Sequence, residues 1–142
     1  MATTVNNTTV NTRITIIFDA AGALNGDGPA KGTGNTESDV YLDDKIYLNL
    51  RSHTEIDSNV HALQWDATTN TGELEYIDNR ENLSISSFPQ WATNVVIRCE
   101  AQDSWQIAHA NAMAGDADSQ ANADTTANTA RDNYLSAHNI TY

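Results

Sequence analysis

Four histidines are the side chains of this sequence best suited to bind a metal ion or to move a proton near neutral pH. They are His53, His61, His109 and His138. None of them has the His-x-x-x-His or Glu-x-x-His spacing that would place two ligands on one metal ion. His61 alternates with Leu63 and Trp65, which is typical of a histidine packed on one face of a strand. The histidines therefore predict no metal site.

Acidic and amide side chains occupy alternate positions between Asp116 and Asp124, as they do in a calcium-binding loop. The sixth position is Ala121, where that loop needs glycine for its turn, and the twelfth is Ala127, where it needs a bidentate glutamate. We therefore expect no cation to bind here.

Cys99 is the only cysteine, and it follows Trp91 and Val95 at intervals of four residues. That spacing places the three side chains on one apolar helical face, where burial would keep the thiol unreactive. The glycine-rich residues 22–34 match neither the Gly-x-x-x-x-Gly-Lys-Ser/Thr nor the Gly-x-Gly-x-x-Gly pattern of phosphate-binding loops, so we expect a surface loop there. The sequence predicts a protein that is not an enzyme and that needs no cofactor.

The charge balance excludes several partners. Nineteen acidic residues against seven basic ones give a formal net charge of -12, which repels nucleic-acid backbones and anionic membranes. The longest strongly apolar stretch, residues 14–18, is too short to span a bilayer. Residues 1–11 contain no signal peptide, so we expect a soluble protein that is made and kept without export.

The elements that would position these residues begin with a β-rich head. Alternating apolar side chains predict strands at residues 13–18, 46–51, 60–65 and 73–77, with a short edge strand at 83–85. In the second strand we expect Ile46, Leu48 and Leu50 to be buried. Residues 1–11 are low in complexity and are expected to form a flexible arm.

A helix is predicted from about residue 88 to residue 114. Ser87 and Gln90 have the spacing of a capping box, and Pro89 suits the first turn of a helix. The strand propensity of residues 95–97 is the alternative. Gly115 and Asp116 form the natural break after this helix.

The last quarter of the chain is rich in alanine and has few large apolar side chains, so we expect it to be either disordered or ordered by other chains. A stripe with alternating spacings of four and three residues predicts a coiled-coil seam, and its register shifts near Asn122. The seam residues, which we expect to mediate oligomerisation, are Ala123, Ala127, Ala130, Tyr134 and Ala137.

These patterns predict an α+β fold, in which a small antiparallel β head is followed by a long, Ala-rich, coiled-coil-like helical tail. The expected divisions are a flexible arm at residues 1–11, the head at 12–107 and a helical oligomerisation tail at 108–142. The tail would form a homo-trimer or join a hetero-oligomer.

Part of the head resembles a segment of small bacteriophage tail-associated proteins. The resemblance covers about residues 59–105 and rests on three short stretches and one asparagine, which are Val60-His61-Ala62-Leu63-Gln64-Trp65, Gly72-Glu73-Leu74-Glu75-Tyr76, Phe88-Pro89-Gln90-Trp91-Ala92 and Asn82. The composition of residues 108–138 is similar to that of the coiled-coil parts of phage tail fibres.

The resemblance implies a structural protein of the virion tail that contacts other tail proteins, either in the tail fibre or where the fibre attaches to the baseplate. The chain has no long β-repeat region, which differs from a receptor-binding fibre and suggests an adaptor or a short subunit. The alternatives are a capsid decoration protein and a tail-fibre assembly chaperone that is absent from the virion.

Overall fold

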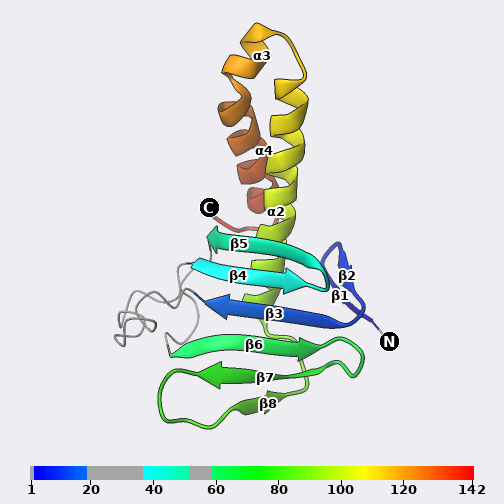
Figure 1. The fold of residues 1–142 in the computed structure, drawn as a ribbon, viewed down its shortest axis with the longest axis vertical. Coiled ribbons are helices and arrows are strands. Elements are labelled where there is room, and N and C mark those ends of the chain that lie inside the picture. The colour runs from blue at the N-terminus through cyan, green and yellow to red at the C-terminus, as the bar shows by residue number, and fades with distance from the viewer. Residues whose placement is uncertain (1, 19–36, 52–58) are drawn as a thin grey trace. The chain divides into compact units, whose positions relative to one another are not determined.

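The computed structural model describes residues 2–18, 37–51 and 59–142, which form two compact units (Figure 1). The first unit is Met1–Val96 and the second is Ile97–Tyr142. The glycine-rich stretch at 22–34 and His53 lie outside the described residues. The second unit therefore begins eleven residues before the predicted start of the tail at residue 108.

The first unit contains a six-stranded antiparallel sheet in the order β5-β4-β3-β6-β7-β8. The strands are β3 (Arg13–Phe18), β4 (Glu37–Leu42), β5 (Lys45–Arg51), β6 (Val60–Asp66), β7 (Thr71–Tyr76) and β8 (Leu83–Ile85). The predicted strands are confirmed, with β8 as the short edge strand, whereas β4 was not predicted. Residues 67–70 connect β6 to β7 in a hairpin.

The predicted faces of β5 are wrong at two positions. Ile46 and Leu48 are 58% and 63% exposed, and only Leu50 is buried. The register of β5 against β4 shifts at a β-bulge, where Asn49 has a φ of 54° and its amide donates to Asp39 Oδ1 over 2.9 Å. An extra residue in one strand reverses the alternation beyond it. The bulge therefore turns Leu50 inward while Ile46 and Leu48 stay outside.

In place of the expected flexible arm, residues 3–10 form a hairpin of β1 (Thr3–Val5) and β2 (Thr8–Val10). Val5 and Val10 are buried, and the indole Nε1 of Trp65 donates to Thr3 Oγ1 over 3.0 Å. The arm gains this order because its two valines and Thr3 all meet the rest of the first unit.

One face of the sheet forms the core of the first unit. Ile14, Ile16, Leu63 and Trp65 lie on that face and are at most 2% exposed. The start of α2 (Gln90–Met113) adds buried residues Ala92, Val95 and Val96. Ring pairs join the layers, Phe18 with Trp91 at 5.5 Å between centroids and Trp65 with Phe88 at 5.2 Å. The prediction of a helix over this segment is confirmed.

The second unit contains the rest of α2, then α3 (Ala117–Ala121) and α4 (Ala123–Ala137). The break at Gly115 and Asp116 is confirmed, because Asp116 caps α3 by accepting from the Ser119 amide over 2.8 Å. Asn122 separates α3 from α4, at the place where the register shift was predicted.

The predicted fold class is wrong. A six-stranded antiparallel sheet and a small two-stranded sheet are followed by helices that pack on one another, and the described residues contain no long coiled-coil tail. The partners of α4 lie in α2 of the same chain, where Leu135 is buried with Ile97 and Ala101. A helix whose apolar face is covered by its own chain does not need a second chain to become ordered.

Candidate functional site

The predicted seam residues differ in how much of each is accessible. Ala123 and Ala127 are buried within the chain, at 2% and 0% exposed. Ala130 and Tyr134 are half-buried, and Ala137 is exposed. The stripe therefore lies on α4 as the spacing predicts, but the structure does not present its members as one continuous surface.

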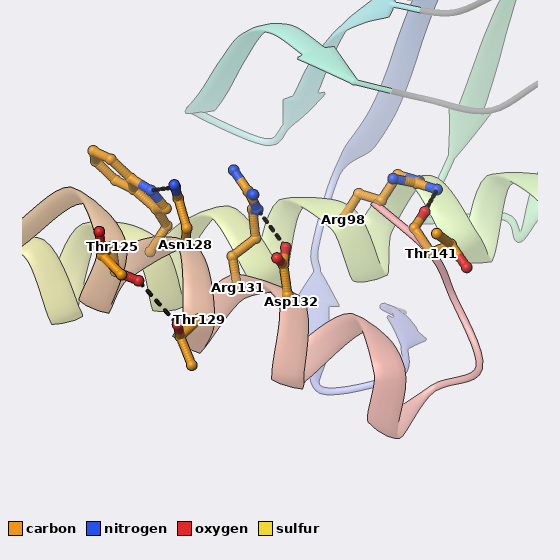
Figure 2. Close-up of polar contacts among 8 residues, drawn as sticks. Arg98, Thr125, Asn128, Thr129, Arg131, Asp132 and Thr141 are labelled. Carbon is orange, nitrogen blue, oxygen red and sulfur yellow. Dashed lines mark hydrogen bonds and ion pairs between the residues drawn. The ribbon is translucent and has the colours of Figure 1, made fainter.

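Polar pairs run along the contact between α2 and α4. Tyr134 donates its hydroxyl to Glu100 Oε1 over 2.8 Å, and Trp105 donates its indole N–H to Asn128 Oδ1 over 2.9 Å. Residue numbers fall along α4 as they rise along α2, so the two helices are antiparallel. The side chain of Asn128 can be followed in Figure 2. These pairs fix the register of α4, which alanine side chains alone would leave weakly specified.

His109 lies next to this contact. Its ring stacks on Trp105 with 4.7 Å between centroids, and Nε2 lies 3.1 Å from Asp124 Oδ1. Asp124, one of the acidic residues in the segment compared above with a calcium-binding loop, therefore pairs with a histidine. Asp116, another, is a helix cap whose pKa is lowered by the hydrogen bond from the Ser119 amide. Within the described residues, no three histidine, cysteine, aspartate or glutamate side chains gather as metal ligands would.

The C-terminal segment folds back on the same two helices. Asn139 adopts a left-handed conformation with φ 60°, and the Ile140 amide donates to the Leu135 carbonyl over 2.9 Å. This is a Schellman motif, and its usual apolar contact is present because Ile140 packs on the Leu135 cluster. The motif directs the last two residues back toward α2.

Two arginines contact that end. The buried guanidinium of Arg98 donates to the Thr141 carbonyl over 2.7 Å (Figure 2). The guanidinium of Arg131 lies 3.4 Å from the centroid of the Tyr142 ring. Arg131 also donates to Asp132 Oδ1 over 3.0 Å. A charge-assisted bond and a cation–π contact thus anchor a segment that the composition alone would leave unordered.

Large apolar side chains remain exposed near the end of α2. Ile107 is 63% exposed and Met113 is 47% exposed. Ile107, Ala110 and Ala114 follow a spacing of three and four residues, which places them on one helical face, and both alanines are exposed. The predicted seam did not include Ile107, although its spacing to Ala110 and Ala114 was an available signal in the sequence.

The other candidates for chemistry are placed as follows. Cys99 is completely buried, as its position in an apolar stripe predicted. His61 is half-buried on β6, and His138 caps the end of α4 with Nδ1 2.9 Å from the Tyr134 carbonyl oxygen.

No protein-family model, no curated protein and no solved structure matches this chain. None of the described helices combines the length and the apolar character that crossing a membrane requires.

Proposed function

We propose that this protein is a non-catalytic structural component of a bacteriophage virion, serving as an adaptor or short subunit of the tail fibre. Two observations support the proposal. The first is the resemblance of residues 59–105 to small phage tail-associated proteins. The second, which carries it, is the exposed apolar end of α2.

The apolar end of α2 is suited to helix packing. Ile107 and Met113 are large and exposed, and the exposed Ala110 and Ala114 between and beside them have small side chains. Small residues let a partner helix approach closely, while the larger ones supply apolar area. Assembly would thus use the outer face at the end of α2, rather than the stripe positions Ala123 and Ala127, which are already buried. A trimer or a hetero-oligomer with other tail proteins is the favoured state.

Purified particles test the location. We expect mass spectrometry to detect the chain in intact virions and to find it missing from tail-deficient particles. Retention in tail-deficient particles would identify a capsid decoration protein instead. Absence from every purified particle, with presence in the infected cell, would identify an assembly chaperone. Either of the last two results would overturn the tail assignment.

Variants of the apolar end test the assembly surface. Ile107→Gln and Met113→Gln should leave thermal unfolding unchanged, because both side chains are exposed, while mass photometry shows the wild-type oligomer lost. Leu83→Gln is a matched control, since Leu83 is 50% exposed but lies on β8. Assembly that is unaffected in both α2 variants would contradict the proposed surface.

A further inference from the structure

A shallow cavity of about 630 Å³ opens on the first unit, within the size range of small-molecule sites. It is formed by four strands and by Ser86, which directly follows β8. The side chains and backbone that line it are those of Arg13, Gln64, Trp65, Asp66, Thr71, Gly72, Glu73, Ser84, Ile85 and Ser86.

Strand register explains why polar side chains gather here. Arg13 pairs with Asp66, which pairs with Thr71, and this row crosses β3, β6 and β7. The neighbouring row contains Thr15, Gln64, Glu73 and Ser84. Both rows alternate with the buried Ile14 and Trp65, so they lie on the sheet face opposite the core. The two rows form a polar floor four strands wide.

Two of these side chains are already held in place. The Thr15 hydroxyl donates a hydrogen bond to Gln64 Oε1 over 2.9 Å. The carboxamide N–H₂ of Gln64 is therefore the group that can donate to a ligand in the cavity. Asp66 Oδ1 accepts from the Thr68 amide over 2.9 Å, and the Thr68 hydroxyl is the main cause that lowers the pKa of Asp66. Asp66 is therefore an ionised, oriented acceptor at neutral pH.

The charges restrict what can bind. Asp66 and Glu73 disfavour anions, as does the net charge of -12, and the guanidinium of Arg13 opposes a simple cation. A hydroxyl group satisfies both kinds of lining group, because it donates to carboxylates and accepts from Arg13 and Gln64.

We propose that this cavity binds a neutral, hydroxyl-rich ligand of the saccharide class. Carboxylates, a carboxamide, a guanidinium and the hydroxyls of Thr71, Ser84 and Ser86 supply donors and acceptors side by side for adjacent sugar hydroxyls. The inference goes beyond the proposed function and does not depend on it, because the site lies in the first unit and Ile107 lies in the second.

The test is an NMR titration of the full ¹⁵N-labelled chain with glucose, galactose, mannose, N-acetylglucosamine, maltose and lactose. We expect at least one sugar to give saturable shifts centred on the amides of Gln64, Gly72, Glu73 and Ser84. Glu73→Gln and Ser84→Ala should weaken that binding at least fivefold. Glu75→Gln is the matched control on the same strand, because Glu75 is not part of the cavity lining.

Calcium chloride, spermidine and sodium sulfate serve as the charged probes. Failure of every sugar to shift these amides overturns the proposal, as does sugar binding that the Glu73 and Ser84 variants leave unchanged. Shifts at these amides with only a charged probe would also overturn it, and would assign the cavity to an ion. The amide spectra of the variants report whether each remains folded.

Discussion

At the scale of single residues, the packing of Trp65 requires a glycine at the position opposite it on the neighbouring strand. Gly72 is the register partner of Trp65 on β7. A Cβ at residue 72 would lie 2.6 Å from the Gln64 carbonyl oxygen and 2.8 Å from Trp65 Cε3. Backbone and a buried ring both block that position, so neither neighbour can move away at low cost.

We therefore expect Gly72→Ala to lower the free energy of unfolding by about 2–3 kcal/mol, the range for overpacking a rigid site. Chemical denaturation followed by tryptophan fluorescence measures the change. Gly115→Ala is the control, because its new Cβ would meet mainly the Ser119 side chain at 3.0 Å or more and should cost far less. Equal effects of the two substitutions would show that Gly72 is not sterically constrained.

Asp43 connects the end of the N-terminal hairpin to the sheet. Its carboxylate accepts from the amides of Asn11 and Thr12, each over 2.8 Å, and from that of Arg13 over 3.0 Å. The hydrogen bond from Asn11 is the largest cause that lowers the pKa of Asp43 from its ordinary value of 3.8. A lowered pKa means that the folded state favours the charged carboxylate.

The stability that Asp43 contributes is therefore present above its unfolded pKa and is lost as the pH falls through the folded value. We expect Asp43→Asn to cost about 1 kcal/mol at pH 7, as for loss of a capping carboxylate, and the difference from wild type to shrink as the pH falls below the ordinary value of 3.8. Urea unfolding at several pH values measures it. Asp44→Asn, at an exposed neighbouring position, should show little effect at any pH.

At the scale of elements, the bulge in β5 decides which leucine belongs to the core. Leu48 and Leu50 are two residues apart, and regular alternation would place both on one face. They are instead 63% and 8% exposed.

We expect Leu50→Ala to destabilise the protein by about 2–4 kcal/mol, and Leu48→Ala to change stability by less than about 0.5 kcal/mol. Thermal and chemical unfolding distinguish the two. Comparable losses for both would mean that β5 follows the regular alternation that the sequence alone predicts.

The packing of α4 against α2 decides which alanines of the predicted seam are buried. Ala127 is completely buried and Ala137 is exposed, although both belong to the predicted seam. Ala127→Asp places a carboxylate in a packed helix contact, and we expect it to cost about 3–5 kcal/mol and to melt α4. Ala137→Asp should leave the helix intact.

Circular dichroism and mass photometry together separate the two interpretations. Loss of helix in Ala127→Asp at monomer concentrations would agree with packing inside the chain. A variant that kept full helix content but no longer oligomerised would instead support a seam between chains.

At the scale of the whole molecule, the chain of 142 residues has a formal net charge of -12, and its acidic side chains repel one another. Added salt screens that repulsion and should favour the compact state. We expect the unfolding temperature to rise by about 4 °C between 50 mM and 500 mM sodium chloride, equivalent to about 1 kcal/mol. Choline chloride should act equally if screening is the cause. A fall in the unfolding temperature would show that exposed pairs such as Arg80 with Asp78 outweigh the repulsion.

Features that depend on neighbouring residues could be predicted from the amino-acid sequence alone. Alternation located β3, β6 and β7, and the signals at Ser87 to Gln90 and at Gly115 located the two ends of α2. These predictions hold because the periodicity of a side-chain pattern and the capping of a helix are set within a few residues of the chain.

Which surfaces pack together could not be predicted in this way and follows from the folded chain. The β5 bulge requires β4 beside it, and the order of residues 3–10 requires Trp65. Ala127 and Leu135 are buried because α4 packs on α2 of the same chain. The lining of the cavity on the sheet likewise comes from four strands in register. Each outcome depends on pairing between residues distant in sequence, and local periodicity does not specify that pairing.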